Sequence, residues 1–405
     1  MRRSSRKAGE DGSRRFDADT IEREIRERVR DTIELIVEEE LEAALGARVS
    51  ERVGEQRAGY RHGHRERTLT TSLGATTIAM PRARLNGADG SSVEWHSETV
   101  RRYERRTARV DEAILGVYLS GANTRRIKGA LAPLLRGGPL SKDAVSRLIG
   151  RLKEEFETWR ERDLAAEQVR YLLLDGWYPK MRIGRRRVRV PVLVTLGVCA
   201  DGRRIVLDLR LVGEETSAGW QAVVESLVKR HVGVPALAII DGNPGLHDAL
   251  RAEWPQLPIQ RCTAHKLRNL QAKVPMALRE EVAEDYHRMI YGATTAVVEQ
   301  ERKRFRIKWQ KRCAAVVTSL DEAGDELFTF LKFPSSQWRA LRTTNALERI
   351  NEEFRRRTKT QGSLPNEEAV LYLLFGLLRS GQVKLRRLDG HQDMPATTVI
   401  EQKAA

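Results

Sequence analysis

The sequence is short of cysteine and of long apolar runs, and each shortage excludes a class of protein. Its 405 residues include three scattered cysteines, Cys199, Cys262 and Cys313, which exclude a disulfide framework and fit a reducing cytosol. No apolar run approaches the ~20 residues that span a bilayer, so we expect a cytoplasmic protein without a membrane partner. The N-terminus lacks the apolar stretch of a signal peptide. Neither a Walker A loop nor a GxGxxG motif is present, which argues against a nucleotide cofactor.

Acidic residues are also outnumbered by basic ones. The chain has 72 Lys and Arg against 56 Asp and Glu, which gives a formal net charge of +16. An excess of this size favours a polyanionic partner, and nucleic acid is the commonest one. The length allows roughly two or three domains with at least one substantial core.

The N-terminal part has mainly helical patterns. Apolar residues at helical spacing predict a helix over residues 21–46, and a Thr-rich stretch over 60–84, broken by Gly and Pro, predicts a small β unit. Two short helices are expected over 124–152, on either side of a Gly-Gly-Pro break, with Ser141 capping the second. This pair is typical of a helix-turn-helix that reads DNA, although a plain αα-hairpin has the same pattern. A charged linker helix is expected over 152–168.

The pattern then changes to mixed α/β. Uninterrupted apolar runs that end at Asp175 and Asp241 predict central strands, and Asp201-Gly202 between two β-rich runs predicts a hairpin turn. Asn243 is the expected cap of the helix that follows Asp241. The order β-β-β-α-β-α-β predicts an α/β domain with early hairpin strands and later crossovers.

An almost wholly helical stretch then interrupts the α/β pattern and predicts an inserted domain. A helix that carries Glu348 follows it, and Asn366 is expected to cap a hydrophobic helix after that. We therefore expect a mobile basic arm, an N-terminal DNA-binding region, a first core part, a helical insertion, a second core part and a tail, at residues 1–20, 21–162, 163–270, 271–340, 341–388 and 389–405.

Three acidic residues are candidates for chemistry. The dipeptide Asp-Gly by itself is no signal, because it occurs six times: Asp11, Asp89, Asp175, Asp201, Asp241 and Asp389. Asp175 and Asp241 differ from the others because they end buried strands, where ligands gather in α/β sheets. Carboxylates brought together there repel each other unless a cation lies between them. Two aspartates plus an acidic residue from a late helix are what two-metal phosphoryl transfer needs, and Mg²⁺ prefers such oxygen ligands.

Each candidate also has a structural interpretation. Asp175 could lie in a hairpin turn, and Asp241 could cap the helix that follows it. Glu348 lies three residues after Asn345, as in a capping box with Asn345 as N-cap. In the metal-binding interpretation, Leu347, Ile350 and Phe354 pack on the sheet and Glu348 reaches the strand ends from the edge of that face.

Cys262 and His265 form a Cys-x-x-His motif. A structural zinc site needs four ligands, and no second Cys/His pair follows at finger spacing, so we expect no zinc. The motif is then either a buried thiol beside a hydrogen-bonded histidine, or a pair that brings His265 close to Asp241 and the scissile phosphate. Trp338 either stacks on a base or packs in the core. The expected DNA contacts are Arg125, Arg126, Lys142, Arg147, Lys180, Arg268, Trp338, Asn351, Arg355 and Arg356.

Six blocks of the sequence, in this order, resemble the bacterial Mutator-type DDE transposases. They are "AGYRHGHRERTLTTSLGATTIAMPRAR", the helix pair over 124–152, "DGWYPKMR", "IIDGNPGLHDAL", "QRCTAHKLRNL" and "TTNALERINEEFRRRTKTQGSLPNEEAVLYLL". The resemblance covers residues 40–379. Three positions depart from it: His62, His64 and Pro179. Pro179 falls where the family continues a strand, so a bulge or an edge strand is expected at this position.

The resemblance implies a fold and an activity. The expected fold is α/β, with an RNase H-like catalytic core that a helical insertion interrupts before the last acidic residue. The implied catalytic triad is Asp175, Asp241 and Glu348, with two Mg²⁺ ions that Mn²⁺ can replace. The implied activity is that of an insertion-sequence transposase, which binds inverted-repeat ends as an oligomer, a dimer on DNA, in the bacterial nucleoid, and catalyses strand cleavage and 3′-OH strand transfer. An RNase H-fold nuclease such as a junction resolvase, or a catalytically dead DNA-binding regulator, is the alternative.

Overall fold

The structure is a computed structural model that divides into two compact units. It describes residues 18–51, 58–87, 91–120, 122, 124–135, 140–183, 185–212, 217–360, 364 and 366–394. The first unit comprises Met1–Tyr118 and Thr124–Leu148, and the second comprises Leu119–Asn123 and Ile149–Ala405. Most of the expected basic arm lies outside the described residues. No helix among the described residues is long and apolar enough to cross a membrane.

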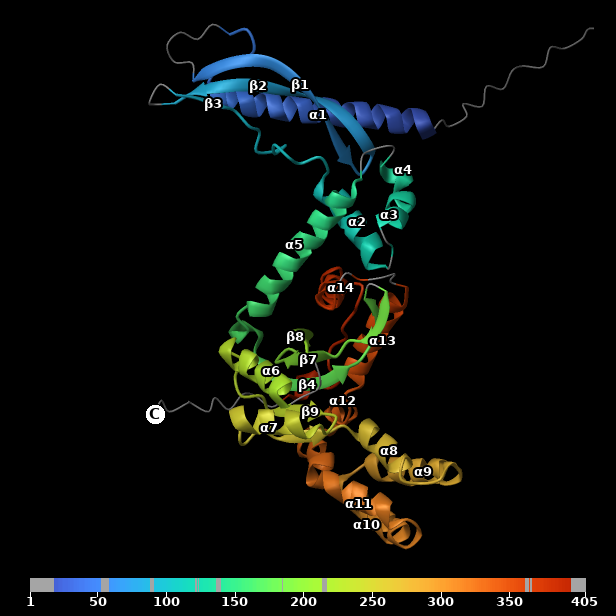
Figure 1. Cartoon of the computed structure of the whole chain (residues 1–405). Helices are drawn as coiled ribbons and strands as arrows, with labels where there is room; N and C mark the ends of the chain where they lie inside the picture. Colours follow the sequence, from blue (N-terminus) through green and yellow to red (C-terminus); the bar gives the residue numbers. More distant parts are fainter. Residues whose placement is uncertain are drawn as a thin grey trace, which may run out of the picture. The chain divides into compact units, whose positions relative to one another are not determined.

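The first unit is built on one long helix and a small sheet (Figure 1). The helix α1 (Ala18–Leu45) and the antiparallel strands β1 (Gly59–Thr71) and β2 (Gly74–Asn86) confirm the predicted helix and β unit. A third, short strand, β3 (Ser92–Glu94), extends the sheet. One apolar stripe of α1 packs on the sheet, because Val37 contacts Leu69 and Ile78 in a buried cluster.

Short helices complete the first unit. They are α2 (Ala108–Leu119), α3 (Thr124–Ala130), α4 (Ala132–Leu135) and the start of α5 (Lys142–Glu161). Ser141 caps α5 as predicted, since its Oγ accepts a hydrogen bond from the Ala144 amide at 3.1 Å. The predicted Gly-Gly-Pro break lies outside the described residues. The expected linker helix is not separate, because α5 continues without interruption to Glu161.

The second unit is organised around a five-stranded mixed sheet with the order β10-β9-β4-β7-β8. The strands are β4 (Val169–Trp177), β7 (Val192–Cys199), β8 (Arg204–Leu211), β9 (Leu237–Ile240) and β10 (Ile259–Arg261). β4, β9 and β10 are parallel, whereas β7 runs antiparallel to both β4 and β8. The predicted hairpin joins β7 to β8, where Gly202 has a φ of +79°. The prediction of a mixed α/β domain is therefore confirmed.

Helices cover this sheet. The helices α6 (Ser217–Lys229) and α7 (Pro244–Glu253) pack on it through Trp220, Leu246 and other buried apolar side chains (Figure 1). Asn243 caps α7 as predicted, since its side chain accepts a hydrogen bond from the Leu246 amide at 3.2 Å. Asn366 caps the hydrophobic helix α14 (Glu368–Arg379) in the same way, at 3.0 Å from the Ala369 amide.

Between β10 and the last part of the sheet domain lies the predicted helical stretch. It consists of α9 (Arg279–Ile290), α10 (Thr295–Arg312), α11 (Ala314–Ala323) and a 3₁₀ segment η3 (Gly324–Lys332), and it is preceded by α8 (Thr263–Gln271), which the prediction assigns to the first core part. These helices bury a core of their own around Tyr286, Phe305 and Trp309. The short helix α12 (Trp338–Leu341) and then α13 (Asn345–Thr360) lead back to the sheet.

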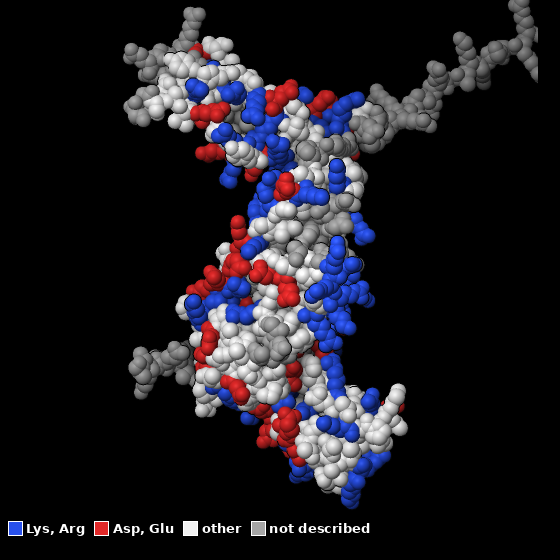
Figure 2. Space-filling view, viewed as in Figure 1, with Lys and Arg blue, Asp and Glu red and all other residues white. Residues whose placement is uncertain are grey.

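Two local features differ from the sequence expectation. A two-stranded hairpin, β5 (Lys180–Ile183) and β6 (Arg186–Arg189), was not predicted, and it follows β4 directly after the interruption at Pro179. The first residues of the expected tail contact the sheet domain, because the Gln337 side chain donates to the Gly390 carbonyl at 2.9 Å and the Ser336 hydroxyl donates to the Asp393 carboxylate. On the face drawn in Figure 2, Lys and Arg side chains gather over α13 and the strands beside it.

Candidate active site

Asp175 and Asp241 lie next to each other at one edge of the central sheet. In the parallel ladder of β4 and β9, Leu174 pairs with Ile240, so the two aspartates occupy the next position on each strand. Asp175 lies within β4 opposite Val194, which excludes the hairpin-turn interpretation. Asp175 is buried, with 6% of its surface exposed, whereas Asp241 is half-buried. The chain therefore holds two carboxylates at the carboxyl ends of neighbouring parallel strands, where α/β sheets bind their ligands.

Glu348 reaches this edge from α13. Leu347, Ile350 and Phe354 are buried on one face of the helix, as predicted, and the Phe354 ring lies 5.7 Å from that of Trp177 in β4. The helix is thereby packed on the strand that carries Asp175. The carboxylate of Glu348 accepts a hydrogen bond from Arg268 Nη2 at 2.8 Å.

The alternative interpretation of Glu348, as part of a capping box with Asn345, is not supported. Asn345 is the first residue of α13 rather than its cap, and the carbonyl of Thr344 accepts the amides of Leu347 and Glu348 at 2.8 and 3.1 Å. The Asn345 amide, which a capping box would direct to Glu348, donates to Thr343 Oγ1 at 3.4 Å. The side chain of Glu348 is thus available for interactions outside its own helix.

The pKa of Asp175 responds to the charges of the other two candidate carboxylates. Burial, together with the negative charges of Asp241 and Glu348, raises the pKa of Asp175 to about 7, although the positive charge of His265 acts in the opposite direction. A carboxyl group is normally ionised well below this pH, so the site holds more negative charge than its surroundings stabilise. A cation between the carboxylates would relieve that repulsion.

Cys262 and His265 lie beside the carboxylates. Cys262 lies between β10 and α8, and its Sγ accepts hydrogen bonds from the amide and the hydroxyl of Thr344, both at 3.4 Å, which links the end of β10 to the start of α13. Burial opposes ionisation of Cys262, but hydrogen bonds from His265 and Thr344 lower its pKa. The interaction with Cys262, and the charges of Asp175 and Asp241, raise the pKa of His265 to about 9. An imidazolium therefore faces the acidic edge at neutral pH.

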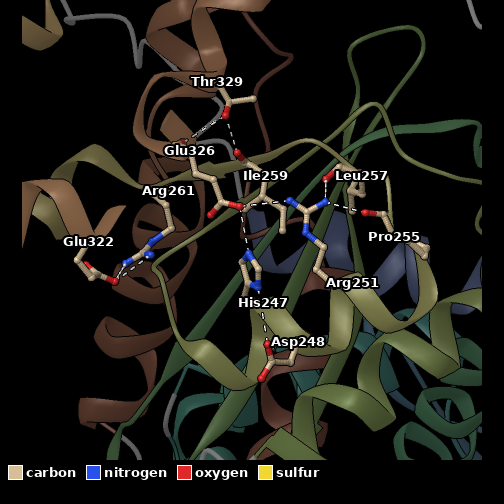
Figure 3. A network of polar contacts seen from close by, with 10 residues as sticks. All are labelled: His247, Asp248, Arg251, Pro255, Leu257, Ile259, Arg261, Glu322, Glu326 and Thr329. Atoms are coloured by element: carbon tan, nitrogen blue, oxygen red, sulfur yellow. Dashed lines mark hydrogen bonds and ion pairs between the residues drawn. The ribbon is translucent and has the colours of Figure 1, made fainter. Parts of the chain in front are cut away.

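A polar network joins β10 and α7 to the helical insertion (Figure 3). Arg261 binds Glu322 of α11 through two contacts of 3.2 Å, and the buried Lys266 binds the same carboxylate. Glu326 of η3 interacts with His247 at 3.0 Å and with Arg251 at 3.2 Å, both from α7. The network was not predicted, because its partners come from five elements, α7, β10, α8, α11 and η3, that span residues 244–332.

Gly242, directly after Asp241, lies against Arg261 of this network. Its φ of +102° favours glycine, and a Cβ atom there would lie 2.1 Å from the guanidinium of Arg261. The guanidinium therefore packs directly against the backbone that carries Asp241. The Asp-Gly dipeptide is needed here for close approach, which differs from the turn role of Asp201-Gly202.

The donor set fits a divalent metal by its chemistry. Asp175, Asp241 and Glu348 offer the hard oxygen ligands that Mg²⁺ prefers, and their mutual repulsion favours a bound cation. In the described part of the chain, no group of three or more His, Cys, Asp or Glu side chains is arranged to hold a metal ion. Glu348 is instead bound to Arg268, so it would have to exchange this partner to complete a ligand set with the aspartates.

The predicted DNA contacts fall into two groups. Seven are exposed: Arg126, Lys142, Arg147, Lys180, Arg268, Arg355 and Arg356. Of these, Arg268 is bound to Glu348, and Arg356 lies 3.2 Å from Glu353.

The others are less accessible or lie outside what the structure describes. Asn351 is buried, and its Oδ1 has no hydrogen-bond partner within the described residues. Trp338 packs edge-on against Phe330 at 5.7 Å and donates to the Phe333 carbonyl at 2.8 Å, so its base-stacking role stays a prediction. The side chain of Arg125 lies outside the described part of the structure.

Comparisons with known proteins point in one direction. Residues 5–385 match the family model described as "Transposase, Mutator family". The sequence is 33% identical over 318 residues to the transposase for insertion sequence element IS406 of Burkholderia multivorans, which covers 78% of this chain and 79% of that protein. It is 31% identical to the transposase for IS1081 of Mycobacterium tuberculosis, over 78% of this chain and 74% of the relative. It is 30% identical to the transposase for IS256 in transposon Tn4001 of Staphylococcus aureus, over 77% and 78%.

Proposed function

The chain belongs to the Mutator family of transposases, and from that premise we propose that it cuts DNA at the ends of an insertion sequence and joins the freed 3′-OH to another phosphodiester. One observation carries the chemical part of this proposal. Two carboxylates, Asp175 and Asp241, follow paired positions of adjacent parallel strands, and Glu348 lies on a helix packed on one of those strands, near enough for its charge to raise the pKa of Asp175. This is the donor set that two-metal phosphoryl transfer needs.

Asp175, Asp241 and Glu348 are the residues that would hold Mg²⁺ or Mn²⁺. When bound, the metal ions would activate the attacking oxygen and stabilise the leaving one. Arg268 binds Glu348 in this structure. If Glu348 exchanged Arg268 for a metal ion, the guanidinium would be free to bind a phosphate oxygen. His265, kept protonated by Cys262 and the aspartates, supplies a positive charge at the same edge. We assign Cys262 and His265 as positioning residues.

The sheet supports the RNase H-like core that the resemblance implies. In the strand order β8-β7-β4-β9-β10, the first strand along the chain, β4, lies in the centre of the sheet. The next strand of this sheet along the chain, β7, runs antiparallel to β4. The helical insertion between β10 and α13 occupies the place expected before the last acidic residue.

Recognition of the element ends belongs, in this proposal, to the first unit. Exposed Lys142 and Arg147 at the start of α5 follow the short helices α3 and α4, which is the arrangement expected for phosphate contacts around a helix pair. We propose a dimer on DNA as the active form, because the two ends of an element must be processed together.

The test is a cleavage and strand-transfer assay with linear DNA that carries the inverted repeats of the element. The wild-type chain is expected to cut only at those ends and only with a divalent metal. Asp175→Asn and Asp241→Asn should lose cleavage while binding of the ends is retained, because each removes a metal ligand and not the fold. Asp201→Asn, which changes an Asp-Gly dipeptide in the β7–β8 turn, is the matched control and should stay active.

Two outcomes would contradict the proposal. Near wild-type cleavage by either aspartate variant would show that the triad is wrong. Cleavage that follows DNA branching rather than the repeat sequence would support a structure-specific nuclease.

A further inference from the structure

The hairpin β5–β6 has four cations on one of its faces. In this antiparallel pair, Lys180 lies opposite Arg189 and Arg182 lies opposite Arg187, and residues two apart on a strand share a face. All four side chains are exposed. None of the four forms an ion pair with any residue that the structure describes. The opposite face carries the buried Met181, the partly buried Val188 and Ile183, and, at the turn, the exposed Arg186.

This arrangement is unfavourable for the isolated protein. Like charges directly across an antiparallel pair destabilise the pair, and sheet proteins normally place an acidic or neutral residue opposite a cation. Here two consecutive cross-strand pairs are both cationic. The hairpin is nevertheless held in place, because the Val190 amide donates to the Pro179 carbonyl at 3.0 Å and the Leu364 amide donates to the Arg182 carbonyl at 2.9 Å. A fixed surface of uncompensated positive charge indicates a polyanionic partner.

The place of the hairpin identifies that partner. β5 begins five residues after Asp175, so the hairpin follows directly on the end of β4 that carries the candidate active site. Its contact at Leu364 lies just beyond α13, where Arg355 and Lys359 are exposed. Lys and Arg side chains cover this part of the face in Figure 2. A duplex that enters the acidic edge would therefore pass along these cations.

We infer that the β5–β6 hairpin, together with exposed cations of α13, binds the phosphate backbone of the DNA duplex next to the bond that is cut. This inference rests on the proposed function, since it takes DNA as the substrate of the acidic edge. It assigns to the second unit a DNA-binding surface separate from the end-recognising helices. Because the contacts are to phosphates, this surface binds DNA of any sequence.

The test compares two charge-matched variants of the full-length chain. Arg182→Gln with Arg187→Gln neutralises one cross-strand pair, and Lys303→Gln with Lys311→Gln removes two exposed charges from α10 of the same unit. Affinity for a linear duplex of random sequence is measured between about 50 and 200 mM salt, with EDTA to prevent cutting. The plot of log affinity against log salt should become shallower by about 1.8 for the hairpin variant, and much less for the α10 variant.

A stability measurement separates this role from a structural one. The hairpin variant should melt at the same temperature as the wild type or higher, because a like-charge pair has been removed. Arg182→Lys with Arg187→Lys keeps the charge and should keep the salt dependence. Equal salt slopes for the hairpin variant and the wild type would overturn the inference.

The same variants distinguish this inference from the proposed function. A wild type that never cuts the element ends would contradict the proposed function alone. A wild type that cuts, with a hairpin variant that binds and cuts equally well at all salt concentrations, would contradict the inference alone.

Discussion

Replacing Asp175 by asparagine should stabilise the metal-free protein, and should do so more at high pH than at low pH. Burial and the neighbouring carboxylates raise the pKa of Asp175 from 3.8 to about 7 in the folded chain. The folded state therefore binds a proton that the unfolded state has lost between these two values, so the free energy of unfolding falls as pH rises through that window. A shift of about 3 pH units corresponds to a cost of about 4 kcal/mol above pH 7, as an upper bound.

Asparagine removes this cost because it carries no charge. The variant and the wild type should have similar stability near pH 4, and the advantage of the variant should grow by about 2 to 3 kcal/mol between pH 5 and pH 8. The raised pKa of His265 adds a loss of stability from about 6.5 to 9, but most of this loss is common to both proteins. The comparison therefore isolates Asp175.

Urea unfolding in EDTA, followed by tryptophan fluorescence, measures the difference. Trp177 and Trp220 are buried in the second unit and report on it. Asp201→Asn is the control with the opposite sign, because hydrogen bonds from Arg203 lower the pKa of Asp201 and favour its charged form. If the stability difference between Asp175→Asn and the wild type does not change between pH 5 and pH 8, the argument that the fold disfavours the charged form of Asp175 is refuted.

Three further substitutions test the site. Glu348→Gln should leave the melting temperature nearly unchanged and abolish cleavage and strand transfer, since glutamine cannot supply the charge a hard cation needs; an active variant, or an inactive one that is also unfolded, would contradict this. Arg268→Gln should tighten Mn²⁺ binding to the DNA-free chain about two- to fivefold, the range expected when a competing surface ion pair is removed, and electron paramagnetic resonance of free Mn²⁺ measures it; unchanged or weaker binding would show that Arg268 does not compete for Glu348. Gly242→Ala should cost about 1 to 3 kcal/mol in a urea titration, because alanine is strained at this φ and displaces Arg261; an equally stable variant would show that the close approach is not required.

Local chemistry made many elements predictable from the sequence. Ser141, Asn243 and Asn366 were identified as caps because a side-chain oxygen and a helix start are neighbours in the chain. The candidate triad was proposed from apolar runs that end at Asp175 and Asp241, together with the resemblance. The start of α13 was misplaced by one residue, because the backbone carbonyl of Thr344 closes the first turn and leaves Asn345 inside the helix.

What could not be predicted depends on contacts between distant segments. The interaction of Glu348 with Arg268, and of Arg261 with Glu322, joins side chains that only the folded insertion brings together. The β5–β6 hairpin was not predicted, because its strands are short and basic and lack the apolar run that indicates a buried strand. The alternation of Lys180 and Arg182 with Met181 and Ile183 was the available signal.

The position of the helical insertion has a consequence for incomplete copies of the protein. Asp175 and Asp241 are side by side once β9 has paired with β4, but Glu348 follows in the chain only after the whole insertion. A polypeptide whose synthesis stops within the insertion contains the first unit in full and only two of the three carboxylates. If the first unit recognises the element ends as proposed, such a fragment would bind those ends without cutting them and would compete for them with the full-length chain.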